Sequence, residues 1–170
     1  MRFTKEVWPD DPIEDQRRFN SSLALVNFAR TCAELHPDHR RRLLNEAIWF
    51  WTERGSPSRK YKLRYRTIAA LELQHSMGFT KASKQLAHEH VHERAPAVLK
   101  LLVLQNDASD TLRSMQACVV TRDEHSLLTA QLDVAGWARY RAVGIIPIDM
   151  NTREPMDLDA HITADHDIWD

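Results

Sequence analysis

Two short segments far apart in the chain carry side chains that could form one site. In the first, Glu89 lies within three alternating histidines, His88, His90 and His92. In the second, His125 follows Thr-Arg-Asp-Glu, which is typical of the capped start of a helix. A carboxylate beside an imidazole, together with a second imidazole held by a helix, is a suitable ligand set for a divalent cation. The spacing therefore predicts a metal site built from both segments.

The conformation of the histidine segment decides which side chains converge. In a helix, His88 and His92 lie on one face because they are four residues apart, whereas in an extended segment all three histidines share a face. His92 is therefore a candidate metal ligand beside Glu89 and His125. Imidazole suits zinc or nickel and carboxylate suits magnesium or manganese, so the identity of the metal stays open. A solvated, histidine-rich surface is the alternative interpretation.

These segments resemble the HNH, or ββα-metal, nucleases over about a fifth of the chain. The run Glu89-His90-Val91 is similar to the acidic–histidine pair of that family, and residues 116–125 are similar to its strand and following helix. The resemblance implies that His90 is the general base, that Glu89 and His125 bind the metal, and that Gln116 stands at the family's asparagine position. It also implies a divalent-metal-dependent nuclease, and by analogy a phage or defence context.

A basic segment offers a surface for the phosphate backbone of nucleic acid. Residues 54–66 contain six basic residues and no acidic residue, with two tyrosines interleaved that could stack on bases. The predicted nucleic-acid-binding residues are Arg59, Lys60, Tyr61, Lys62, Arg64, Tyr65 and Arg66. The alternative is a solvated basic face with no ligand.

Two other functional interpretations remain open. Arg30 and His36 have a spacing similar to that of the HEPN ribonucleases, which are helical and need no metal, although a histidine at a helix end is the simpler interpretation. The chain could also be a non-enzymatic helical module that binds nucleic acid or protein. In that case the histidines are surface residues or a structural metal site.

Apolar periodicity and capping residues predict a mainly α fold, a single helical domain with a small two-strand element near the C-terminus. The strand-like segments are 117–120 and 145–148. Helices are expected over residues 11–35, 38–51, 68–77, 96–104, 109–115 and 137–143. Two further helices are expected, one from Thr80 through the histidines and one that begins after Thr121.

Length, charge and composition constrain the function less than these motifs do. The chain has 170 residues and a net charge of -1, which suits one globular domain, taken as residues 1–148. Residues 149–170 hold seven acidic residues and one basic residue, and we expect an extended acidic tail near the basic segment. Two cysteines and the lack of long apolar runs favour a cytoplasmic protein that is not in a membrane. Nucleic acid is the expected partner, and a homo-oligomer stays open.

Overall fold

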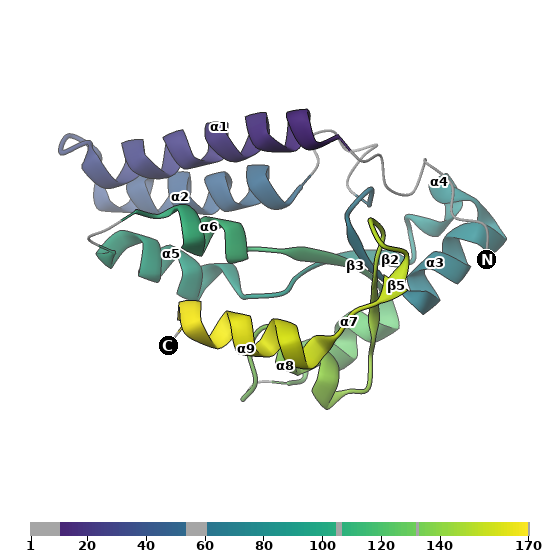
Figure 1. Cartoon of the computed structure of the whole chain (residues 1–170). Coiled ribbons are helices and arrows are strands. Elements are labelled where there is room, and N and C mark those ends of the chain that lie inside the picture. Colours follow the sequence, from purple (N-terminus) through teal and green to yellow (C-terminus); the bar gives the residue numbers. More distant parts are fainter. Residues whose placement is uncertain (1–10, 54–60, 105–106, 132, 170) are drawn as a thin grey trace.

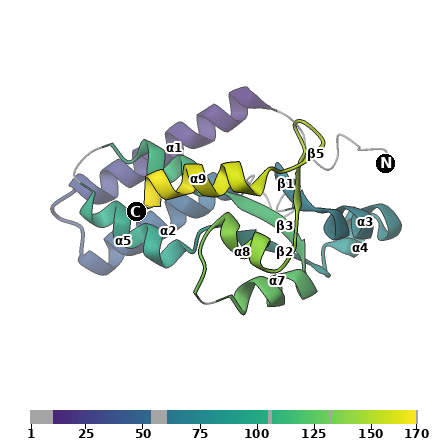
Figure 2. The ribbon, with the colours of Figure 1, turned by 60° about the horizontal axis from the view of Figure 1, so that its bottom comes forward.

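The computed structural model describes the chain except for residues 1–10, 54–60, 105–106, 132 and 170 (Figure 1). The described part combines helices with a five-stranded sheet whose strand order is β2-β3-β1-β4-β5. A layer of helices lies to one side of the sheet, and further helices cover its faces (Figures 1 and 2). Among the described residues, no helix has the length and apolar character needed to cross a membrane.

The prediction of a small two-strand element near the C-terminus is wrong. The five strands are β1 (Tyr65–Thr67), β2 (Leu86–His90), β3 (Ala117–Thr121), β4 (Pro147–Asp149) and β5 (Glu154–Pro155). β1 and β3 are parallel and the other neighbours are antiparallel. Most of these strands are only two or three residues long or contain polar residues, so apolar periodicity marks them weakly.

The histidine segment is one of these strands. The predicted helix from Thr80 stops after one turn, as α4 (Phe79–Ala82), and β2 pairs with β3 along its whole length. The helix expected to continue through the histidines is therefore wrong, and the extended alternative holds for His88 and His90. Pairing with a strongly buried neighbour outweighs the weak local preference of such a short polar segment.

The helical layer consists of α1 (Pro12–Thr31), α2 (Pro37–Thr52), α5 (Arg94–Val103) and α6 (Ser109–Ser114). Its buried core includes Phe19, Leu44, Ile48 and Leu101. The predicted start of α1 is confirmed, since the Asp11 carboxylate accepts a hydrogen bond from the backbone N–H of Glu14. This layer borders the sheet through the C-terminal half of α2.

The faces of the sheet are covered by two helical groups. α7 (Arg122–Thr129), α8 (Trp137–Ala142) and α9 (Leu158–Trp169) pack on the face that carries Cys118 and Val120. α3 (Ile68–Met77) and α4 pack against Ala117 and Val119, which point the opposite way. β3 is buried on both faces, which explains its continuous apolar sequence and confirms the predicted strand.

The acidic C-terminal segment is not an extended tail. It forms β5 and the twelve-residue helix α9, and its residues Met156 and Leu158 are buried in the core beneath α8. Trp169 packs against the core of the helical layer. Within the described part of the basic segment, Arg64 pairs with the C-terminal segment, since Asp149 accepts two hydrogen bonds from it, of 2.9 and 2.6 Å.

A buried arginine organises the loop before β1. Arg66 is fully buried and donates hydrogen bonds to the side-chain oxygen of Gln74 on α3 and to the main-chain oxygens of Tyr61 and Leu63. One guanidinium thus joins the loop, β1 and α3. These hydrogen bonds explain why the charged Arg66 is buried in β1 between Tyr65 and Thr67, which are buried as well.

We predict that Arg66→Met destabilises the protein by about 3 kcal/mol, because at least two buried oxygens lose their donor. Chemical denaturation followed by circular dichroism measures this loss. Lys81→Met, at an exposed position of α4, is the matched control and should change the unfolding free energy by less than about 0.5 kcal/mol. Equal effects of the two substitutions would contradict a structural role for Arg66.

Candidate functional site

Alternation along β2 separates the side chains of the histidine segment. Glu89 pairs in register with Cys118, so it points toward the face covered by α7 and α8. His88 and His90 pair with Val119 and Ala117 and point toward the other face. The structure therefore does not bring His90 and His125 together, because Glu89, on the opposite face from His90, is the residue that contacts α7.

The first turn of α7 holds His125 in a fixed position. α7 follows β3 directly, and Thr121 and Glu124 form the predicted capping box. The Glu124 carboxylate also accepts a hydrogen bond of 2.6 Å from the hydroxyl of Thr67 in β1. Since the cap is tied to the sheet in this way, the first turn of α7 has a fixed orientation over Glu89.

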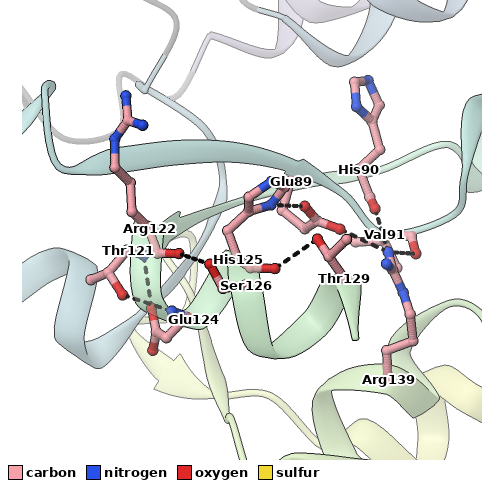
Figure 3. Close-up of polar contacts among 10 residues, drawn as sticks. All are labelled: Glu89, His90, Val91, Thr121, Arg122, Glu124, His125, Ser126, Thr129 and Arg139. Carbon is pink, nitrogen blue, oxygen red and sulfur yellow. Dashed lines mark hydrogen bonds and ion pairs between the residues drawn. The ribbon is translucent and has the colours of Figure 1, made fainter. Parts of the chain in front are cut away.

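Glu89 and His125 form a close polar pair (Figure 3). His125 Nδ1 lies 2.6 Å from Glu89 Oε2, although the residues are 36 positions apart in sequence. A carboxylate can only accept, so His125 donates its Nδ1 proton to Glu89, and in the neutral ring the lone pair is on Nε2. The His125 side chain is 45% exposed, whereas that of Glu89 is 8% exposed. The His125 ring is therefore accessible to solvent, while the buried Glu89 carboxylate holds it in place.

Arg139 of α8 completes the arrangement. Its guanidinium lies 2.9 Å from Glu89 Oε1 and donates to the main-chain oxygens of His90 and Val91 at 2.7 and 2.8 Å (Figure 3). Arg139 is 4% exposed, so its charge and that of Glu89 compensate each other in the interior. Both oxygens of Glu89 are consequently engaged, one by Arg139 and one by His125.

On the opposite face, His90 lies in a crowded aromatic environment. Its ring centroid is 4.7 Å from that of His88 and 5.4 Å from that of Trp49 on α2. The Thr52 hydroxyl donates to the main-chain oxygen of Ile48, so His90 Nε2–H donates to Thr52 Oγ1 over 3.0 Å. Burial, assisted by the charge of Arg94, lowers the pKa of His90 to about 3. His90 is therefore a neutral, partly buried residue packed against aromatic rings.

This environment predicts a specific dependence of stability on pH. The pKa of His90 is about 3 when folded against 6.5 ordinarily, so between these values the unfolded chain binds the additional proton. The free energy of unfolding therefore falls on acidification from pH 6.5, by up to about 1.4 kcal/mol per pH unit from this group. His90→Phe should flatten this slope in denaturation series at several pH values.

The exposed His75 of α3 supplies the matched control. His75→Phe should leave the pH slope unchanged, because the exposed His75 side chain has no buried environment that the substitution could alter. An identical slope in the wild-type protein and His90→Phe would show that His90 is protonated without penalty in the folded state.

His92, the third histidine, lies beyond the end of β2 and contacts α9. Its Nε2 is 2.9 Å from Asp165 Oδ2, and its ring stacks on Trp169 with centroids 4.4 Å apart. Gly136 packs against this pair, because a β-carbon there would lie 2.6 Å from the His92 ring and 3.0 Å from Asp165. His92 also borders a cavity of about 510 Å³. It is thus part of the attachment of α9 and lies apart from the Glu89–His125 pair.

The other predicted site residues lie elsewhere. Gln116 precedes β3 and borders a second cavity, and its main-chain oxygen accepts the N–H of Val91. Tyr65 and Arg66 are buried, so neither is accessible to nucleic acid in this structure, and burial raises the pKa of Tyr65 to about 12.

The rest of the predicted basic surface is only partly available. The Tyr61 hydroxyl donates to the main-chain oxygen of Leu86, Lys62 lies over the Phe79 ring, and Arg64 pairs with Asp149. Residues 59 and 60, Arg59 and Lys60, lie outside the described residues. The segment is therefore a mixture of structural and exposed positions.

The residues at Glu89 do not fit the expected metal site. In the described part of the chain, no group of three or more histidine, cysteine or acidic side chains is arranged to hold a metal ion. The guanidinium of Arg139 already occupies one oxygen of Glu89, and its positive charge opposes a second cation at the same carboxylate. The arrangement instead suits proton transfer by His125.

Sequence reasoning identified Glu89 and His125 but not Arg139. In sequence, Arg139 is an ordinary basic residue of a short helix, and only the packing of α8 shows that it is buried. Comparison of the chain with protein-family models, with curated proteins and with solved structures finds no significant match. The function is therefore argued from the geometry of this site.

Proposed function

We propose that the protein is a phosphodiester-cleaving enzyme in which His125 acts as general base without a bound metal ion. The observation that carries this proposal is the half-exposed His125, whose Nδ1 proton is held by the buried carboxylate of Glu89. A carboxylate in this position fixes the tautomer and stabilises the imidazolium that forms when Nε2 accepts a proton. Arg139 holds the Glu89 carboxylate in place through its other oxygen.

Single-stranded RNA is the substrate class that suits such a site. A ribose 2′-hydroxyl is an internal nucleophile, so deprotonation by one imidazole is sufficient to start cleavage. His125 Nε2 takes the 2′-hydroxyl proton, a bond forms between O2′ and phosphorus, and the bond between phosphorus and O5′ breaks. The leaving oxygen takes a proton from water, and the products are a 2′,3′-cyclic phosphate and a 5′-hydroxyl.

The surroundings of His125 support this choice. Arg122 lies three residues earlier on α7 and is exposed, so it is a neighbour of His125 on the helix surface. Its Nε donates to the main-chain oxygen of Lys84, just before β2, which fixes the guanidinium on the helix surface toward that end of the strand. A cation there suits the negative charge of a phosphodiester.

We expect purified protein to cleave a single-stranded RNA oligonucleotide in the presence of EDTA and to leave DNA of the same sequence intact. His125→Gln should lower kcat/KM by at least about 100-fold, because the general base is lost. Cleavage of a fluorescently labelled substrate measures the rate. His75→Gln is the matched control, and its activity should equal that of the wild-type protein.

Glu89 is tested as a positioning residue by its effect on the pH profile. Glu89→Gln removes the negative charge that stabilises the imidazolium of His125. The acid limb of the kcat/KM profile should therefore move to lower pH. Circular dichroism verifies that the variant is folded. Cleavage that needs added magnesium or manganese would overturn the metal-independent mechanism. Equal activity of His125→Gln and the wild-type protein would overturn the assignment of His125.

A further inference from the structure

An open crevice lies where the parallel strands β1 and β3 end. Each strand runs directly into a helix, β1 into α3 and β3 into α7. The two helices pack on opposite faces of the sheet, and a cavity of about 750 Å³ lies between them. In sheets with helices on both faces, ligands commonly bind at such a point, beyond the carboxyl ends of the strands.

One face of α3 forms the first wall of the crevice. Its lining residues recur at helical spacing, as Ala69, Glu72, Leu73 and Ser76. Ala69 and Leu73 provide an apolar surface, and the exposed Glu72 lies beside them on the same face of the helix. A flat ring can therefore pack on the apolar part of this wall while it forms hydrogen bonds to the carboxylate.

The opposite wall comes from the residue before β2, the end of β3 and the first turn of α7. Its lining residues are Gln85, Thr121, Arg122, Asp123 and Glu124. The main-chain oxygen of Gln85 accepts the N–H of Arg122, which joins the two parts of this wall. Glu124 is already engaged, since its carboxylate accepts hydrogen bonds from the N–H of Thr121 and from the hydroxyl of Thr67.

Two other carboxylates of the crevice are available to a ligand. Within the described part of the chain, the side chains of Glu72 and Asp123 form no ion pair and no hydrogen bond, and both residues are exposed. Arg122 uses its Nε for the main-chain oxygen of Lys84. The crevice therefore offers carboxylate acceptors beside an apolar surface, with one guanidinium on the wall nearest to His125.

Among the four bases of RNA, guanine matches these groups best. Its Watson–Crick edge carries two adjacent donors, the N1–H and the N2 amino group, which can bond to both oxygens of one carboxylate. Adenine and cytosine have an acceptor beside their amino group, and uracil has oxygens on both sides of its N–H. Each of these three bases would bring an acceptor against the carboxylate, which is unfavourable.

We propose that this crevice holds a guanine base of the RNA substrate and that Glu72 is the residue that selects it. The base packs on Ala69 and Leu73, and the phosphate of its nucleotide is placed toward Arg122, three residues before His125 on α7. The role of the crevice as a substrate subsite rests on the proposed cleavage of RNA at His125. The binding of guanine, however, can be measured without cleavage.

Hexanucleotides of 2′-O-methyluridine with one central guanine, adenine or cytosine test this proposal, because they lack the 2′-hydroxyl and cannot be cleaved. By fluorescence anisotropy, the wild-type protein should bind the guanine oligonucleotide at least about 10-fold more tightly than the other two. Glu72→Gln should reduce this preference to less than about 3-fold and leave the affinity for the adenine oligonucleotide nearly unchanged. Glu154→Gln, at an exposed position of β5, is the matched control and should keep the full preference.

His125→Gln separates this inference from the proposed function. A preference for guanine that persists in this variant supports the crevice even if the wild-type protein cleaves no RNA. Cleavage of RNA together with equal binding of the three oligonucleotides would overturn the crevice and leave the role of His125 intact. An undiminished preference in Glu72→Gln, or no binding of the guanine oligonucleotide, would also overturn it. Circular dichroism verifies that the compared variants are folded.

Discussion

The buried ion pair between Glu89 and Arg139 joins the sheet to α8 and fixes the geometry on which the candidate site depends. Glu89 belongs to β2 at the edge of the sheet, and Arg139 also holds the main-chain oxygens of the two residues that follow it. Removing either partner would leave a buried charge without compensation, a change that typically costs several kcal/mol. The position of His125 follows from this pair, because its ring is held by the second oxygen of Glu89.

The same strand separates two chemical environments. The face with Glu89 presents an exposed imidazole held by a carboxylate, whereas the face with His90 encloses a neutral imidazole among aromatic rings. His90 and His125 thus have different roles, because His90 points to one side of β2 whereas His125 contacts Glu89 on the other side from α7. This arrangement also separates His90, the expected general base, from Glu89 and His125, the expected metal ligands, because His90 lies on the opposite face of β2 from Glu89.

Local signals in the sequence predicted the parts of the structure that local interactions determine. The cap of α1 at Asp11, the buried strand before Thr121 and its capping box all have short-range signatures, and the structure confirms them. The polar strand β2 and the docking of α9 depend on long-range pairing and packing, which periodicity does not reveal. Glu89 and His125 were expected in one site because their two motifs were read together, whereas no signal in the sequence marked Arg139 as a buried partner.

The state of the His125 ring tests this account most directly. Long-range nitrogen–proton correlation spectra of ¹⁵N-labelled protein, recorded above the pH at which His125 is protonated, distinguish the two neutral tautomers. The account predicts that His125 carries its proton on Nδ1, held by Glu89, and that Glu89→Gln shifts the ring toward a mixture of tautomers. A wild-type His125 with its proton on Nε2, or in rapid exchange between both nitrogens, would contradict it.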